Sequence, residues 1–114
     1  MHEMSIALSI IDAVATKAEE EHAKKVNGIE LEVGKLAGVE AGSLKFCFSA
    51  AAKGTVAEGA ALDIREIQPV GVCSECGRRF SMNFYYSACD SCGSFKTDLV
   101  SGRELLIKSI ILEE

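Results

Sequence analysis

Several features are missing from the sequence, and each absence removes a class of protein. The 114 residues contain no run of about 18 uncharged apolar residues, so no membrane-spanning helix is expected. The N-terminal segment lacks the basic and then apolar layout of a secretory signal peptide, which favours a cytoplasmic location. Acidic residues outnumber basic ones by 17 to 12, and no basic stripe occurs, so nucleic acid is not an expected partner.

The hydrophobic pattern that is present predicts an α+β fold with a small three-stranded sheet and two helices. Apolar residues recur at helical spacing in two segments and alternate with polar residues in two others. A last apolar segment is expected to form a well-buried strand. In chain order, the predicted elements are helix 4–25, strand 29–36, helix 41–53, strand 61–67 and strand 104–112.

The two predicted helices carry further expectations about single residues. In the first, the side chains of one apolar stripe are expected to face the core; the stripe contains Met4, Leu8, Ile11, Ala15 and Ala18, is widened by Ala7 and Val14, and has Ile10 at its edge. Gly54 follows the second helix and is expected to end it in the left-handed conformation. Cys47 lies within the second helix between two phenylalanines, and we interpret it as a small buried apolar residue.

A cysteine-rich segment, residues 71–102, precedes the last strand. Cys73 and Cys76 form one CxxC pair, Cys89 and Cys92 form a second, and a glycine follows each pair. A two-residue spacer lets both sulfurs of a pair reach one metal ion, so the two pairs predict a tetrahedral four-thiolate site. The expected metal is structural Zn(II), because four protein ligands leave no open position for catalysis. We therefore expect an inserted zinc-ribbon-like module.

Other interpretations of the four cysteines are chemically allowed but fit the sequence less well. Two disulfides would require an oxidising compartment, and four thiolates also suit iron in a site of rubredoxin type. A reversible redox site would need only one pair. The aromatic residues between the pairs are expected to cover the metal site and to pack inside the module; they are Phe80, Phe84, Tyr85 and Tyr86.

The sequence opens with Met-His-Glu, which makes His2 a second candidate metal ligand. The imidazole and the amide nitrogen of His2 would close a six-membered chelate ring, and the Met1 amine would close a five-membered one. Nitrogen donors in a plane suit Ni(II) or Cu(II). Against this, a helix N-terminus repels cations, and a single histidine at a chain end is commonly solvated without any ligand role. The residues alone leave both interpretations open.

Four segments, in their order along the chain, resemble the HypA/HybF family of nickel metallochaperones for [NiFe]-hydrogenase maturation. The segments are MHEMSIALSII, LEVGKLAGVE, AKGTVAEGAALDI and the paired CxxC motifs. The resemblance covers essentially the whole chain. It implies nickel at His2, with Met1 and Glu3 as the adjoining residues of the motif, and zinc at the four cysteines. It also implies work with a HypB-type GTPase and with the [NiFe]-hydrogenase large subunit.

The combined prediction is a nickel carrier without catalytic activity that is cytoplasmic and monomeric or weakly dimeric. Its nickel-binding α+β domain would comprise residues 1–70 and 103–114, and its zinc module residues 71–102. A urease-directed nickel role is compatible with the same sequence.

The main rival is a zinc-ribbon module that binds nucleic acid or another protein. Arg78, Arg79 and Lys96, with aromatic residues nearby, offer slight support for nucleic-acid binding. The acidic balance of the chain opposes it. A zinc enzyme is not expected, because the predicted site is closed and no His/Glu pair forms an open catalytic site.

Overall fold

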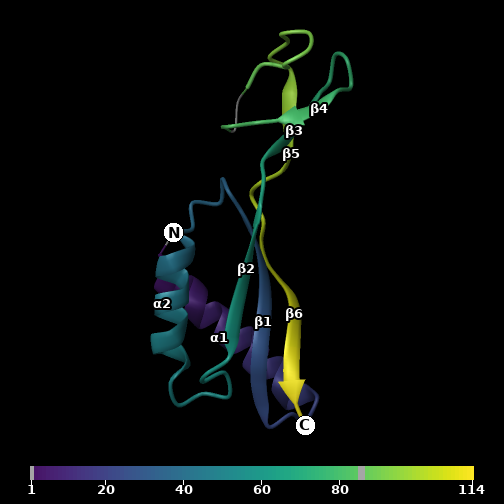
Figure 1. The fold of residues 1–114 in the computed structure, drawn as a ribbon. Coiled ribbons are helices and arrows are strands. Elements are labelled where there is room, and N and C mark those ends of the chain that lie inside the picture. The colour runs from purple at the N-terminus through teal and green to yellow at the C-terminus, as the bar shows by residue number, and fades with distance from the viewer. Residues whose placement is uncertain (1, 85–86) are drawn as a thin grey trace. The chain divides into compact units, whose positions relative to one another are not determined.

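A computed structural model describes residues 2–84 and 87–114, and Figure 1 shows the fold. Its elements are α1 (Glu3–Glu20), β1 (Lys25–Gly34), α2 (Ala41–Ala52), β2 (Ala61–Ile67), β3 (Val70–Cys73), β4 (Arg79–Ser81), β5 (Thr97–Ser101) and β6 (Leu105–Glu113). The chain divides into two compact units. The helical unit contains Gly38–Arg65, Leu106–Glu114 and the segment that ends at Glu32, and the cysteine unit contains Val33–Ala37 and Glu66–Leu105.

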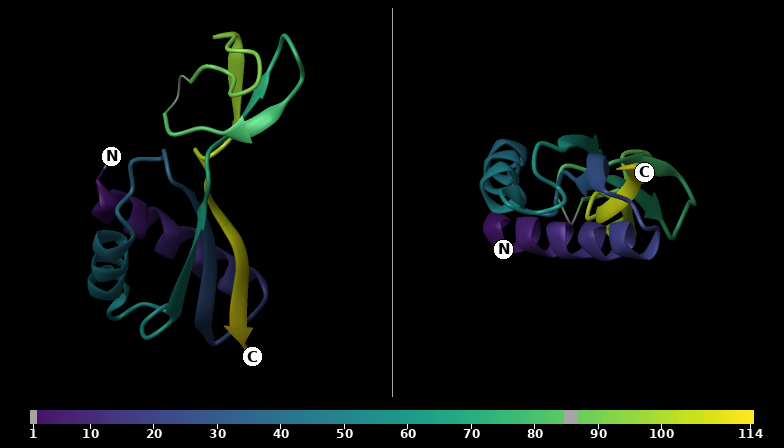
Figure 2. Two further views of the ribbon diagram at one scale, coloured as in Figure 1. Left: turned by 45° about the horizontal axis from the view of Figure 1, so that its top comes forward. Right: turned by 90° about the horizontal axis from the view of Figure 1, so that it is seen from below.

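The helical unit is built on a three-stranded sheet in the order β2-β1-β6. α1 crosses one face of this sheet, and α2 lies beside the outer strand β2 (Figure 1 and Figure 2). Apolar side chains from each layer fill the core, and Val14 of α1, Leu31 of β1 and Leu44 of α2 are fully buried there. The chain leaves α2 through Gly54, whose φ of +79° is the left-handed conformation that the sequence predicted.

The buried face of α1 differs from the predicted one. Met4 and Leu8 are 41% and 55% exposed, whereas Ile6, Ile10 and Val14 are buried. The prediction was wrong for Met4 and Leu8, but it was correct for Ile11, Val14 and Ala18, which are buried. Apolar residues occur on nearly every side of the first turns, so helical periodicity alone does not select the inner face there.

β6 is an outer strand, whereas the sequence predicted a well-buried one. Among the described strands it pairs only with β1, and Leu106 and Ile111 remain 44% and 64% exposed. A continuous apolar run is typical of a central strand, but the place of a strand in its sheet depends on pairings that are distant in sequence. α1 also ends at Glu20, earlier than predicted, because the chain turns and enters β1 at Lys25.

The cysteine unit contains a second three-stranded sheet, antiparallel and in the order β4-β3-β5. Gly71 on the central strand β3 is opposite Phe80 of β4. A side chain at Gly71 would collide with Met82, because a Cβ there would lie 2.1 Å from Met82 Sδ. The glycine therefore lets Phe80 and Met82 cover β3, and these two residues form the buried core of the unit together with Cys73 and Cys89.

A second close approach joins two distant segments within the cysteine unit. The Gly34 amide donates to the Glu104 carbonyl at 2.7 Å, and the Leu36 amide donates to the Gly102 carbonyl at 2.7 Å. A Cβ at Gly34 would lie only 2.1 Å from the Gly102 carbonyl carbon, so no larger residue fits.

These observations confirm the predicted α+β class, with two helices, a small three-stranded sheet and a four-cysteine module. None of the described helices is long and apolar enough to cross a membrane.

Candidate metal centres

Two nearly identical turns present the four cysteines. In the first turn the Gly77 amide donates to the Cys73 carbonyl at 2.8 Å, and in the second the Gly93 amide donates to the Cys89 carbonyl at 3.0 Å. Gly77 and Gly93 have φ values of +77° and +75°, in the left-handed region that glycine adopts without strain. The glycine after each CxxC pair thus closes a tight turn around its two sulfurs.

The four cysteine sulfurs converge on one point. The Sγ atoms of Cys73, Cys76, Cys89 and Cys92 all lie within 4.8 Å of one another. The Cys73–Cys92 and Cys76–Cys89 sulfur pairs are each 3.6 Å apart. Four sulfurs bound at about 2.3 Å in a tetrahedron around zinc would be about 3.8 Å apart. The four predicted ligands therefore fit a tetrahedral thiolate site, and Cys47, half-buried on α2, is not part of this cluster.

The thiols of the cluster differ in acidity. The pKa of Cys73 is lowered by backbone N–H groups directed at its sulfur, chiefly the N–H of Cys76. The pKa of Cys89 is lowered to about 7 in the same way, chiefly by the N–H of Cys92. The Ser94 N–H has the same effect at Cys92, but the neighbouring thiol of Cys73, burial and the Cys89 thiol together raise the pKa of Cys92 to about 12. The pKa of Cys76 is also raised. Within each pair, therefore, the pKa of the buried first cysteine is lowered and that of the exposed second one is raised.

Two ion pairs connect the segments that carry the cysteine pairs. Arg78 Nε lies 2.7 Å from Asp90 Oδ1, and Lys96 Nζ lies 3.5 Å from Glu75 Oε1. Each pair joins a residue near the first CxxC to a residue near the second. All four side chains are about half exposed or more, so the pairs contribute little stability. Their consequence is that Arg78 and Lys96 are already matched with carboxylates.

The aromatic cover of the cluster is smaller than predicted. Phe80 is buried, but Phe84 is 70% exposed, so its predicted packing role is wrong. Tyr85 and Tyr86 lie outside the described residues. Met82, which the sequence analysis did not single out, is buried instead at 2% exposure. The available signal was its spacing of two from Phe80, which places both side chains on one face of an extended segment.

His2 lies at the N-cap of α1 with its imidazole exposed. Its backbone is extended, with φ −87° and ψ 128°, and its side chain makes no capping hydrogen bond. Its carbonyl accepts a bond from the Ile6 amide at 3.3 Å, so the main chain of His2 begins the helix. Met1 lies outside the described residues. His22 follows the other end of α1, so the structure does not bring the two histidines together.

The starts of the two helices meet at Glu3. Glu3 Oε2 accepts a hydrogen bond from the Glu40 amide at 3.4 Å, and the Glu40 carboxylate in turn accepts one from the Ser43 amide at the start of α2. These backbone hydrogen bonds, from Ser43 and then Gly42, lower the pKa of Glu40. The sequence analysis missed this contact, because Glu is not among the usual N-cap residues and no pattern links positions 37 residues apart.

Comparison with known proteins agrees with this arrangement. A family model described as "Hydrogenase/urease nickel incorporation, metallochaperone, hypA" matches residues 1–112. The chain is 70% identical over 113 residues to the hydrogenase maturation factor HypA of Chlorobium phaeobacteroides (strain BS1), a match that covers 99% of this chain and 100% of that relative.

Two solved structures are similar in fold. One is the solution structure of the Ni metallochaperone HypA from Helicobacter pylori, with a TM-score of 0.70 and 23% identity over 99% of this chain and 98% of that one. The other is a solution structure of HypA protein, with a TM-score of 0.76 and 24% identity over 98% of this chain and 96% of that one. From the family match and the 70% identity, the chain belongs to the HypA family of hydrogenase and urease nickel-incorporation metallochaperones.

Proposed function

We propose that the chain binds Ni(II) at the start of α1 and delivers it during [NiFe]-hydrogenase maturation. In this proposal His2 supplies its imidazole and amide nitrogen, Met1 its amine and Glu3 its amide nitrogen. The observation that carries the proposal is the exposed imidazole of His2, which caps no helix amide, beside the Glu3 amide, which has no acceptor among the described residues.

The start of α1 offers nitrogen donors that the fold does not use. Among the residues that the structure describes, Ile6 is the first of the helix whose amide has a helical acceptor. Within residues 2–84 and 87–114, the imidazole of His2 and the amide of Glu3 have no hydrogen-bond partner. A planar nitrogen site suits Ni(II), and binding releases protons from the coordinating groups. The carrier therefore needs no rearrangement of its core to take up the ion.

The helix dipole opposes a cation at this end, so the site requires compensating negative charge. Glu3 provides a carboxylate there, and amides that lose their protons on binding provide more. Because Glu3 Oε2 already accepts the Glu40 amide, we assign Glu3 a main-chain ligand and a local charge rather than a carboxylate ligand.

We assign the nickel-binding domain to residues 1–70 and 103–114, and the zinc module to residues 71–102. Zn(II) would be held by Cys73, Cys76, Cys89 and Cys92. The closed set of four thiolates supports a resident structural ion, and it leaves no open position for a substrate. In this proposal the carried ion, nickel, is bound by nitrogen ligands, and the resident ion, zinc, is bound by thiolates.

The proposed partners are a HypB-type GTPase, which would assist transfer, and the hydrogenase large subunit, which would receive the ion. We place the chain in the cytoplasm as a monomer or weak homodimer without catalytic activity. The rival proposal of a nucleic-acid-binding ribbon loses support, because two of its three basic residues, Arg78 and Lys96, are paired with acidic neighbours.

Nickel titration of zinc-loaded protein with an untagged N-terminus tests the assignment. Isothermal calorimetry and the near-ultraviolet absorbance of planar Ni(II) should report about one ion per chain. His2→Ala should weaken binding by more than about 100-fold, since loss of even an outer partner of a metal ligand commonly costs 10–100-fold. One additional residue before Met1 should cause a similar loss, because it displaces the amine from its chelate ring.

His22→Ala is the matched control, since His22 is also exposed and lies beyond the other end of α1. It should bind nickel like the parent. Undiminished stoichiometric binding by the His2→Ala or extended chain would overturn the assigned site.

A further inference from the structure

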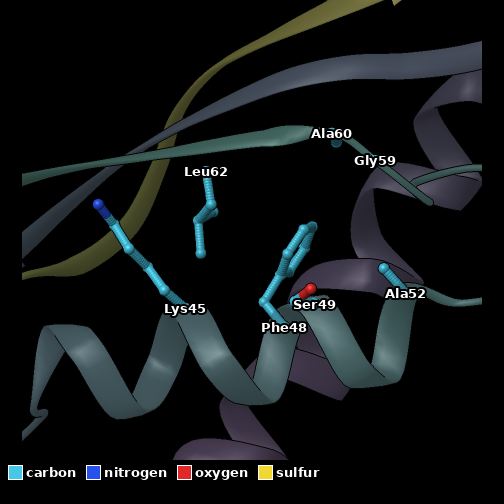
Figure 3. A pocket seen from close by; sticks show the side chains of 7 residues that line it. All are labelled: Lys45, Phe48, Ser49, Ala52, Gly59, Ala60 and Leu62. Atoms are coloured by element: carbon cyan, nitrogen blue, oxygen red, sulfur yellow. The ribbon is translucent and has the colours of Figure 1, made fainter.

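A groove in the helical unit lies between α2 and β2 and takes no part in either proposed metal site. Its volume is about 290 Å³. Phe48 of α2 and Leu62 of β2 point into it from opposite sides, and Ala52 and Ala60 line it toward the end where Gly59 lies (Figure 3). Phe48 is 3% exposed, so its ring forms the floor of the groove. This volume is at the lower limit of small-molecule sites, roughly 300 Å³, so the groove suits a few side chains rather than a cofactor.

One wall of the groove is the outer strand of a sheet. In the order β2-β1-β6, β2 has a strand partner only on its β1 side within the described residues. The other edge therefore presents backbone N–H and C=O groups to any extended chain that enters. A peptide that adds a strand there would obtain main-chain hydrogen bonds, and every second side chain would reach the apolar floor.

The rim of the groove is cationic although the chain is acidic. Lys45 lies at one end, and Gly59 lies at the other, as Figure 3 shows. A Cβ at Gly59 would lie 3.9 Å from Lys25 Nζ, which brings a second ammonium group to that end. Within residues 2–84 and 87–114, neither lysine forms an ion pair. One lysine without an ion pair thus lies at each end of the groove, in a chain of formal charge −5.

We propose that this groove docks an extended segment of a partner protein in which apolar and acidic residues alternate. The segment adds to the free edge of β2, its apolar side chains contact half-buried Leu62 above the floor formed by Phe48, and its carboxylates pair with Lys45 and Lys25. The net charge of the chain is negative and by itself would favour a basic peptide. The preference for an acidic segment therefore comes from the two lysines at the groove.

A second copy of the chain is the main competing occupant, since β2 itself alternates apolar and charged residues. Symmetric pairing of two β2 edges would bring both lysine-rimmed grooves together and oppose like charges. This repulsion favours a partner segment over self-association.

The test uses full-length, zinc-loaded, ¹⁵N-labelled protein and two capped eight-residue peptides. One peptide alternates valine with glutamate, and the other alternates valine with lysine, so both have the same strand propensity. The valine–glutamate peptide should shift amide signals of β2 and of the groove face of α2 and slow hydrogen exchange in β2. The valine–lysine peptide should leave these signals unchanged.

Two substitutions with matched controls locate the binding site. Ser49→Trp places a bulky side chain at the groove from an exposed position, and it should abolish binding, whereas Ala50→Trp on the next exposed position of α2 should not. Lys45→Glu should weaken binding up to about fivefold, as expected for the loss of an exposed ion pair, and Lys108→Glu on β6 should not.

Three results would overturn the proposal. Equal response to both peptides would show that local charge does not select the segment, and absence of any shift would show that the edge does not accept a strand. If sedimentation showed that the parent protein dimerises with increasing concentration and that Ser49→Trp does not, the groove would be assigned to a second copy of the chain. Nickel binding by all four variants should be unchanged, so failure here is separate from failure of the nickel site.

Discussion

Removal of the metal from the four-cysteine cluster should unfold the cysteine unit and leave the helical unit folded. Apart from the cysteines, the buried cluster of the cysteine unit contains only Phe80 and Met82 among the described residues. Burial of two such side chains contributes about 3–6 kcal/mol. Structural zinc in comparably small modules contributes about 10–16 kcal/mol. The metal is therefore the larger stabilising term in this unit.

The helical unit has an apolar core of its own that includes Val14, Leu31 and Leu44 and contains no metal ligand. On addition of a chelator, ¹H–¹⁵N spectra should lose dispersion for residues 68–104 and keep it for α1, α2 and the sheet β2-β1-β6. Cys76→Ser should have the same effect and should lower the zinc content. Cys47→Ser, which alters a half-buried cysteine outside the cluster, is the matched control and should do neither.

If the amide signals of Phe80 and Met82 kept their native chemical shifts in metal-free protein, this reasoning would be refuted, because side-chain packing alone would then fold the unit. A full complement of zinc in Cys76→Ser would refute the four-thiolate assignment itself.

Three further substitutions test the fold around the proposed sites. Leu31→Ala should lower the free energy of unfolding in urea by about 2–5 kcal/mol, because Leu31 is 1% exposed in the core. Gly34→Ala should destabilise by at least about 1–3 kcal/mol in the same assay, because its methyl group would overlap the Gly102 backbone. Glu40→Gln should lower Tm at pH 7, because the Ser43 and Gly42 amides favour the Glu40 carboxylate and lower its pKa. This contribution is present above the ordinary pKa of 4.5 and is lost as pH falls through the lowered value, so the Tm difference should shrink in acid.

Local chain geometry explains why the cysteine turns were predictable. In each CxxC-Gly segment the two ligands, the carbonyl acceptor and the glycine amide lie within five consecutive residues. Sequence spacing therefore encodes the turn, and only the meeting of the two turns depends on the rest of the fold. The end of α2 was predictable for the same reason, since Gly54 is the residue that tolerates a positive φ.

Features that depend on distant contacts were not predictable. Burial of Ile6 rather than Met4 is decided by the sheet and by α2, because both residues are apolar and lie within one turn. Ile111 is exposed because β6 is an outer strand of its sheet. The apolar run 104–112 does not indicate whether its strand is central or outer. The Glu3–Glu40 contact likewise exists only after α1 and α2 pack together.

The difference between the two ligand sets has a kinetic consequence for a carrier. Zinc at the cluster would be held by four side chains, two of which, Cys73 and Cys89, belong to the buried core of the cysteine unit, so its release requires that unit to open. Nickel at His2 would be held by one side chain and by main-chain nitrogens of residues 1–3, which precede Ile6, the first described helix residue whose amide has a helical acceptor. Its release requires no core residue to move. Nickel exchange should therefore be fast compared with zinc exchange, and isotopic exchange of both ions in one sample would measure that ratio directly.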